Sequence, residues 1–131
     1  MDSAPIRQDV LTRAPETVIV LEREVLVRSS LAKYLRSCGY RVLEARSAAE
    51  AITILQESSE SIRIVLSDAE SGFRLCGWVK ANLPKTKIIL AANTERASHA
   101  AAELCDAGPH GKRPYDPQQI VQQIKASLAR G

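Results

Sequence analysis

The stretch Ser61-Ile62-Arg63-Ile64-Val65-Leu66-Ser67-Asp68 decides the fold that this sequence predicts. Its apolar centre, Ile64-Val65-Leu66, is too short for a helix and rich enough in β-branched residues for a strand that is buried on both faces. Asp68 follows this strand at once. In an open parallel α/β sheet, ligands bind beyond the carboxyl ends of the strands, so Asp68 is a candidate for chemistry. An acid in this place can equally serve as the cap of the next helix.

Short apolar runs on both sides of this stretch predict further strands, each followed by a segment with helical periodicity. A capping box at Ser47–Glu50 and the pair Asp116-Pro117 mark two of the expected helix starts. Strands joined by crossover helices pair in parallel, with the helices on both faces. The sequence therefore predicts an α/β domain with a doubly wound, five-stranded parallel sheet in three layers. The other expected strands lie at residues 18–21, 40–44, 87–91 and, as a short fifth strand, 110–112.

Length and composition indicate one soluble domain. The chain has 131 residues, of which 45% are hydrophobic and 25% charged. Residues 1–15 are predicted to be a flexible leader and residues 16–131 to form the domain. The sequence has no run long enough to span a bilayer and no signal-peptide pattern, so we expect a cytoplasmic protein without a membrane partner. The net charge of +3 is too small to favour direct binding of nucleic acid.

The three cysteines, Cys38, Cys76 and Cys105, are odd in number and far apart in the sequence. Their spacing forms neither a disulfide framework nor a metal-binding pattern. We therefore expect reduced, buried thiols.

In the predicted fold, the carboxyl ends of four strands meet at one edge of the sheet. These ends bring together Glu22-Arg23-Glu24, Asp68, Ala91-Ala92 and Lys112-Arg113. Carboxylates suit a hard divalent cation, and fixed positive charge suits phosphoryl oxygens. The sequence thus predicts a phosphoryl or magnesium site at this edge.

At this point the chain resembles a known family, the receiver domain of two-component response regulators, which has a flavodoxin-like fold. The resemblance covers roughly residues 17 to 130 and rests on the order and spacing of several short segments. It implies a bacterial signalling protein, not an enzyme, that takes part in phosphorelay signal transduction. The segments are Val18-Ile19-Val20-Leu21-Glu22-Arg23-Glu24, Gly39-Tyr40-Arg41-Val42-Leu43-Glu44-Ala45, Ile64-Val65-Leu66-Ser67-Asp68, Ile88-Ile89-Leu90-Ala91-Ala92, Ala107-Gly108 and Arg113-Pro114-Tyr115-Asp116.

The resemblance assigns roles to several residues. Asp68 takes the position of the aspartate that accepts a phosphoryl group from a histidine kinase or phosphotransfer protein. Glu22, Asp68 and the backbone carbonyl of Glu70 would hold Mg²⁺. Arg113, with Lys112 beside it, takes the place of the lysine that contacts the phosphoryl oxygens.

Other positions depart from the family pattern. Arg23 stands where the second acid of the metal-binding pair is expected, so we expect Mg²⁺ binding to be weak or absent. Ala91 stands at the hydroxyl position and donates no hydrogen bond, so we expect a weak conformational switch. His110 falls near the aromatic switch position. We further expect Arg23 or Arg113 to pair with Asp68, with an Arg23 that points into water as the alternative.

Two functional hypotheses follow, and a third is weaker. The first is an atypical, stand-alone response regulator that takes phosphate on Asp68. The second is a pseudo-receiver that works as a phosphorylation-independent interaction module, through its last two helices and the short strand between them. Either would act on a downstream protein partner, with a homodimer as a further possibility. The third, a flavodoxin-like enzyme or cofactor carrier, lacks a glycine-rich loop after the first strand.

Overall fold

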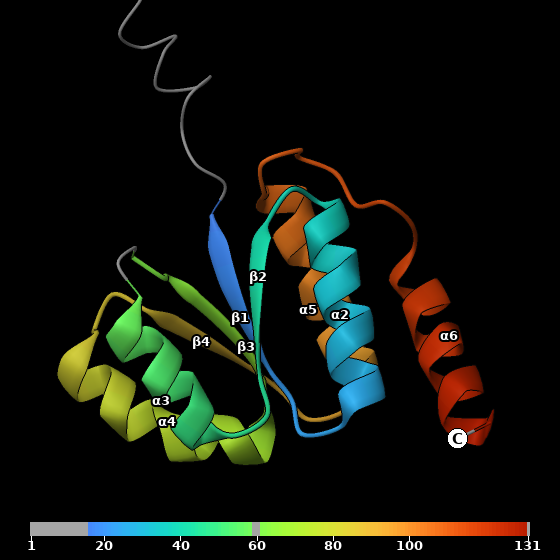
Figure 1. The fold of residues 1–131 in the computed structure, drawn as a ribbon. Helices are drawn as coiled ribbons and strands as arrows, with labels where there is room; N and C mark the ends of the chain where they lie inside the picture. The colour runs from blue at the N-terminus through green and yellow to red at the C-terminus, as the bar shows by residue number, and fades with distance from the viewer. Residues whose placement is uncertain (1–15, 59–60, 131) are drawn as a thin grey trace, which may run out of the picture.

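The computed structural model describes residues 16–58 and 61–130 of the chain. Four strands of this part form one parallel sheet in the order β2-β1-β3-β4 (Figure 1). Ile19 in the centre of the sheet pairs with Leu43 on one side and Val65 on the other, and Asp68 lies opposite Ala91. The strands are β1 (Thr17–Leu21), β2 (Arg41–Ala45), β3 (Ile64–Asp68) and β4 (Lys87–Ala91).

Helices cover both faces of the sheet, as predicted (Figure 1). On one face lie α3 (Ala48–Glu57) and α4 (Ala69–Asn82), which pack against each other. On the other face lie α2 (Val25–Ser37) and α5 (Thr94–Ala107). The last helix, α6 (Pro117–Arg130), packs on α2 and α5. The parallel α/β layers are therefore confirmed, and α6 adds a further element outside them.

Side-chain caps set the starts of several helices. The Ser47 hydroxyl accepts a hydrogen bond from the Glu50 N–H at the start of α3, as the capping box predicts. Asn93 accepts from the Arg96 N–H at the start of α5. Asp68 does the same for α4, so the capping interpretation of Asp68 is confirmed.

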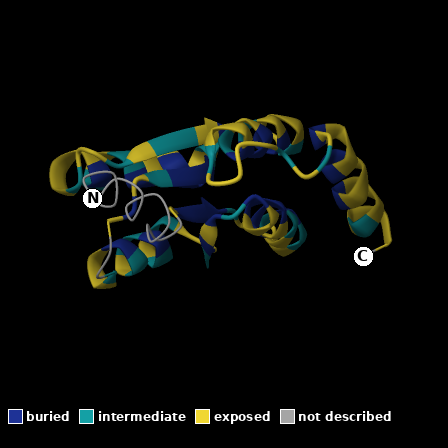
Figure 2. Ribbon diagram, turned by 90° about the horizontal axis from the view of Figure 1, so that it is seen from above, coloured by how far each residue is buried: buried dark blue, intermediate teal, exposed yellow. Residues whose placement is uncertain are grey.

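The core has two parts, one on each face of the sheet. Every residue of β1 is buried, because β1 is covered from both faces. Val18 and Val20 pack toward α2 and α5, whereas Ile19 and Leu21 pack toward α3 and α4. Figure 2 shows the buried residues gathered where the helices face the sheet.

The prediction of a fifth strand at residues 110–112 is wrong, because the described part of the chain forms no strand there. Residues 110–112 lie in turns, and Gly111 has a positive φ of 70°. Pro109 and two glycines, Gly108 and Gly111, interrupt any extended run in this segment. In a five-stranded sheet, α5 would connect β4 to the fifth strand across the face that α4 covers. Without that strand, α5 packs beside α2 on the other face.

The expectation of three reduced cysteines is also wrong. Cys38 and Cys105 form a disulfide, and Cys76 is free. The two bonded residues are 67 positions apart, so their pairing depends on the packing of α5 against α2, which the spacing of the cysteines does not reveal. The predicted leader, residues 1–15, lies outside the described residues. None of the described helices is both long and apolar enough to cross a membrane.

Candidate functional site

Asp68 lies at the carboxyl edge of the sheet, at the end of β3 and the start of α4. Its side chain is 13% exposed. The Oδ1 atom accepts a hydrogen bond of 2.8 Å from the Ser71 N–H. The Oδ2 atom is buried and has no hydrogen-bond partner within the described part of the chain. One carboxylate oxygen therefore serves the helix, and the other keeps its lone pairs free inside the protein.

Arg23, in the turn after β1, covers this carboxylate. Its Nε lies 4.0 Å from Asp68 Oδ2, at the limit of an ion pair, and its Nη1 pairs closely with Glu70 Oε1. The Arg23 side chain is 62% exposed, so solvent screens both interactions. Arg23 thus approaches Asp68, as we expected for one of the two arginines, but its closer partner is Glu70.

Glu22 is the second acid near Asp68. Its Oε2 accepts a hydrogen bond of 2.8 Å from the Glu24 N–H. Burial raises the pKa of the Glu22 carboxyl above its ordinary value. The hydrogen bond from Glu24 lowers this pKa in part, and the charge of Asp68 raises it again. The two carboxylates are therefore close enough to repel each other.

These residues do not fit a magnesium site of the kind that the resemblance implies. A hard divalent cation needs several oxygen ligands. Here the Glu22 carboxylate binds a backbone N–H, and the Arg23 cation lies beside the free oxygen of Asp68. Within residues 16–58 and 61–130, no group of three or more His, Cys, Asp or Glu side chains is placed to hold a metal ion.

A hollow of about 300 Å³ opens next to Asp68, between the turn after β1 and the starts of α3 and α4. Three guanidinium groups line it, but each has an acidic partner. Arg46 lies 3.6 Å from Glu50, and Arg74 lies 4.0 Å from Glu70, which also binds Arg23. Three arginines at the hollow thus share two acids, Glu50 and Glu70. Its lining consists of Arg23, Arg46, Ser47, Ala48, Ala49, Glu70, Ser71 and Arg74.

Ala91, which stands where the resemblance implies a hydroxyl residue, lies beside Asp68 and donates no hydrogen bond from its side chain. Ala91 is buried and pairs with Asp68 across the sheet. The Ser67 hydroxyl, on the same strand as Asp68, donates to the Asp68 backbone carbonyl oxygen at 2.7 Å and not to the carboxylate.

Lys112, Arg113 and His110 are not brought to Asp68. They belong to the connection between α5 and α6, at the opposite edge of the sheet, where β2 begins. Arg113 forms a forked pair with Asp106, with N–O distances of 3.2 and 2.6 Å. The His110 ring lies against Gly39, which directly precedes Tyr40. The expected contact of Arg113 with a phosphoryl group on Asp68 is therefore not supported by this geometry, because α5 runs back to the far edge before Arg113 is reached.

Arg28 is a residue of the site that sequence reasoning missed. Its side chain is 11% exposed. Its Nε donates to Glu44 at 3.2 Å and its Nη1 donates to the backbone carbonyl of Glu22 at 2.9 Å. Arg28 thus fixes the turn that carries Glu22 and Arg23. No sequence spacing links Arg28 to Glu22 and Glu44. An arginine on the side of α2 that faces β2 is only a weak sequence signal for such contacts.

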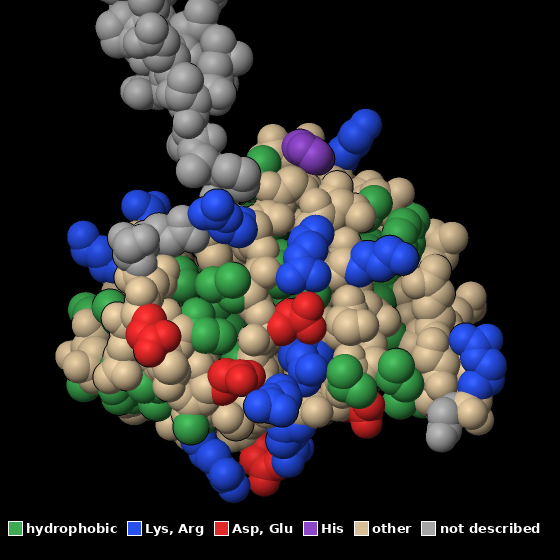
Figure 3. All heavy atoms as spheres, viewed as in Figure 1, with side chains coloured by type: hydrophobic (Ala, Val, Ile, Leu, Met, Phe, Trp, Pro, Cys, Tyr) green, Lys and Arg blue, Asp and Glu red, His purple; other side chains and the backbone are tan. Residues whose placement is uncertain are grey.

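The ion pairs continue over the surface beside this turn. Arg36 lies 3.4 Å from the other oxygen of Glu44. On the face that Figure 3 shows, basic and acidic side chains are interspersed and do not form a patch of one sign.

Comparisons with known proteins point in one direction. No family model matches the chain. The transcriptional regulatory protein GltR of Pseudomonas aeruginosa is 26% identical over 121 residues, which are 87% of this chain and 49% of GltR. The sensor kinase CckA of Brucella abortus is 29% identical over 120 residues, which are 87% of this chain and 13% of the kinase. The chain spans about half the length of the transcriptional regulators that it matches.

Solved structures agree with these relatives. The receiver domain from the hybrid histidine kinase CckA has 25% sequence identity and a TM-score of 0.56, over 86% of this chain and 98% of that domain. A CheY-like response regulator receiver domain from Methanospirillum hungatei has 19% identity and a TM-score of 0.54, over 88% of this chain and 94% of that chain. The second likeness concerns the fold alone.

Proposed function

We propose that this chain, a receiver domain of two-component signalling, passes its signal on through protein contacts that do not require a phosphoryl group on Asp68. The observation that carries the proposal is the environment of the Asp68 carboxylate. One oxygen caps α4, and the other is buried under the turn that carries Arg23. The resemblance places a metal-binding acid where Arg23 stands.

The chemistry of phosphoryl transfer supports this choice. Transfer to a carboxylate places several negative charges in one small site, and divalent metal and fixed cations normally balance them. At this edge of the sheet, Glu22 and Asp68 repel a further anion. Arg23 is the cation nearest to Asp68 among the residues that the structure describes, and it is shared with Glu70. Arg113, the expected phosphate ligand, is held by Asp106 at the other edge.

Slow phosphorylation of Asp68 is the second candidate function. The Oδ2 atom of Asp68 favours this candidate. No donor among the described residues binds this oxygen, so its lone pairs are free to act as a nucleophile. The donor would be a histidine kinase or a phosphotransfer protein. In this candidate, Arg23 would supply part of the charge that Mg²⁺ supplies elsewhere, and the domain would remain a signalling module and not an enzyme.

The partner surface that we propose is formed by α5 and α6. The inner side of α6 is buried against α2 and α5 through Ile120, Val121 and Ile124. Its outer side is exposed. Leu128 follows Ile124 by one helical turn on the inner side, yet it is an exposed large apolar side chain near the end of the helix. A downstream protein, or a second copy of the domain, would contact the outer side. The names of the relatives, which are transcriptional regulators and a sensor kinase, are compatible with such a role.

The intact mass of the protein after incubation with Mg²⁺ and acetyl phosphate tests this proposal. We expect no phosphoryl adduct on the native chain, while a phosphorylatable receiver domain treated in parallel is labelled. Asp68→Asn is the control for the site. An adduct on the native chain that is absent from Asp68→Asn would overturn the proposal and establish the second candidate.

A further inference from the structure

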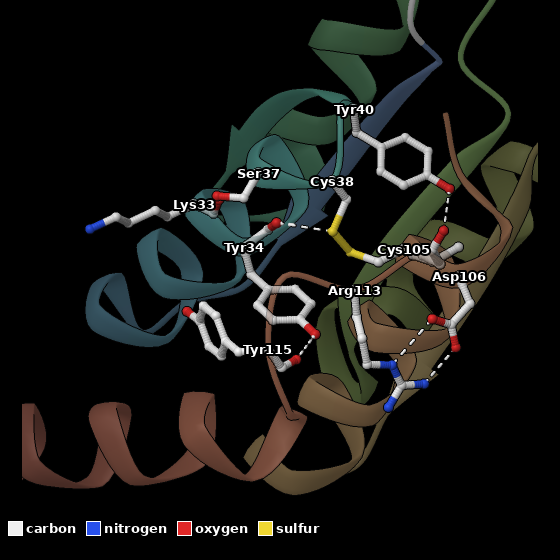
Figure 4. The surroundings of a disulfide bond; sticks show 10 residues. Lys33, Tyr34, Ser37, Cys38, Tyr40, Cys105, Asp106, Arg113 and Tyr115 are labelled. Atoms are coloured by element: carbon white, nitrogen blue, oxygen red, sulfur yellow. Dashed lines mark hydrogen bonds and ion pairs between the residues drawn. A yellow bond between two sulfur atoms is a disulfide. The ribbon is translucent and has the colours of Figure 1, made fainter. Parts of the chain in front are cut away.

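The edge of the molecule opposite Asp68 is held together by the disulfide between Cys38 and Cys105. Cys38 ends α2 and Cys105 lies in the last turn of α5, with 5.3 Å between the two Cα atoms. Both residues are fully buried. Figure 4 shows that the bond crosses directly from one helix to the other. This bond therefore ties the second half of the chain to the first.

Hydrogen bonds around the disulfide join the same two parts of the chain. The Tyr40 hydroxyl, next to the start of β2, donates to the Leu104 carbonyl at 2.6 Å. The Tyr34 hydroxyl of α2 donates to the Tyr115 carbonyl at 2.6 Å, and the two tyrosine rings meet edge to face. All these contacts hold the end of α5 and the connection to α6 against α2 (Figure 4). The disulfide is the covalent member of this clamp.

The reduced form of the clamp is compatible with the fold. The two cysteines lie in an apolar cluster with Tyr34, Ala101 and Ala102, where a thiol packs as a small hydrophobic group. The clamp's hydrogen bonds use tyrosine hydroxyls and backbone carbonyls, and none of them needs the sulfur–sulfur bond. Reduction therefore removes one covalent tie and leaves a folded domain with a looser edge.

We propose that Cys38 and Cys105 form a reversible thiol–disulfide site that controls how firmly α5, the connection 108–116 and α6 are held against α2. When this edge opens and exposes the buried bond, a dithiol reductant gives two electrons and two protons to the disulfide, which becomes two thiols, and the reductant becomes a disulfide. The oxidised domain presents α5 and α6 as a fixed surface, and the reduced domain presents a mobile one. The signalling consequence rests on the proposed function, because α5 and α6 form the proposed partner surface.

The position of the bond limits the effect of reduction to one edge of the domain. It does not join neighbouring segments of one motif but closes a span of 67 residues, between the helix after β1 and the helix after β4. Opening it changes the restraint on one edge only, because the carboxyl edge with Asp68 lies at the other end of the sheet. A redox signal and a signal at Asp68 would thus enter the domain at opposite ends.

Counting free thiols on the full chain tests the proposal first. Protein prepared without reductant, in its oxidised form, is unfolded and alkylated with iodoacetamide. We expect one alkylated cysteine, Cys76, before treatment with dithiothreitol and three afterwards. Three alkylated cysteines in the oxidised sample would overturn the proposal.

Hydrogen–deuterium exchange and thermal unfolding test the conformational part. On reduction of the native chain, we expect faster exchange in residues 104–116 with little change around Asp68, and a melting temperature lower by roughly 10 °C. Cys38→Ala/Cys105→Ala should match the reduced chain both with and without dithiothreitol, and Cys76→Ser should respond like the native chain. If the double variant does not fold, the comparison of the native chain with and without dithiothreitol still tests the proposal.

Equal exchange in residues 104–116 of the oxidised and reduced chains would overturn the control that we propose. These measurements use no phosphodonor, so they stand or fall independently of whether Asp68 is phosphorylated. A redox response in a chain that is also phosphorylated would reject the proposed function and keep the thiol–disulfide site.

Discussion

The Nε atom of Arg23 lies 4.0 Å from Oδ2 of Asp68, while the other end of the same guanidinium binds Glu70. Arg23 therefore places a positive charge beside the free oxygen of the Asp68 carboxylate. The carboxylate is held in place from the opposite side, by its hydrogen bond with the Ser71 N–H. The consequences of this arrangement for metal binding, stability and pH dependence are open to direct measurement.

Replacing Arg23 by aspartate should create a magnesium site. The change removes the cation beside Asp68 and adds a third carboxylate to those of Glu22 and Asp68, which is the ligand type that Mg²⁺ prefers. We expect binding with a roughly millimolar dissociation constant, measured by isothermal titration calorimetry. Arg74→Asp, which adds an acid to the same hollow farther from Asp68, is the matched control. Equal titrations of the two variants would contradict the prediction.

Asp68→Ala should destabilise the domain because α4 loses its cap. Loss of an N-cap oxygen costs about 1 kcal/mol, whereas asparagine caps as well as aspartate. We therefore expect Asp68→Ala to lower the free energy of unfolding by about 1 kcal/mol and Asp68→Asn to leave it nearly unchanged, in urea titrations. Ser47→Ala, which removes the cap of α3, should cost a similar amount. A stable Asp68→Ala variant would show that the capping bond contributes little.

Ionisation of Glu22 should weaken the fold as the pH rises. Burial, with the charge of Asp68 as a further contribution, holds the pKa of Glu22 above its ordinary value of 4.5. The folded state therefore binds this proton more tightly than the unfolded chain does. The free energy of unfolding is then expected to fall as the pH rises from the ordinary value through the raised pKa, and to stay lower above it.

Glu22→Gln removes this titration and keeps an acceptor for the Glu24 N–H. We expect the variant to melt at a higher temperature than the native chain at pH 7, and the difference to disappear near pH 4. Glu103→Gln, on the exposed side of α5, controls for the loss of one negative charge. A Glu22→Gln variant that is less stable than the native chain at pH 7 would count against this assignment.

Much of the sheet and its carboxyl edge could be predicted from local sequence. The uninterrupted apolar runs of β1 and β3 reveal strands buried on both faces, and the capping residues Ser47 and Asn93 sit directly before the helices that they start. These signals are local, since each depends on a few neighbouring residues. The position of Asp68 followed from the same local pattern.

The packing of α5 could not be predicted in this way. Its small-residue stripe, with Ala97 and Ala101, fits either face of the sheet, and the choice depends on whether another strand follows. The turn-forming residues of 108–111 prevent that strand, so α5 lies beside α2. The Cys38–Cys105 bond and the pairing of Arg113 with Asp106 both follow from this one change. For the same reason, Lys112 and Arg113 lie in the connection after α5, away from Asp68.

Arg28 should contribute more to stability than its neighbour Arg36, although both pair with Glu44. Both arginines also bind a backbone carbonyl, Arg28 that of Glu22 and Arg36 that of Val42, but Arg28 is 11% exposed and Arg36 is 51% exposed. Removing the partly buried guanidinium leaves the Glu22 carbonyl without this donor and the Glu44 carboxylate with Arg36 alone, so we expect Arg28→Ala to cost about 2 kcal/mol. Arg36→Ala, whose pair is screened by water, should cost less than about 1 kcal/mol. Urea unfolding of the two variants checks the order.

Because Arg28 also fixes the turn that carries Arg23, its loss should speed hydrogen exchange at residues 22–24. Unchanged exchange there would show that the turn holds its shape without Arg28.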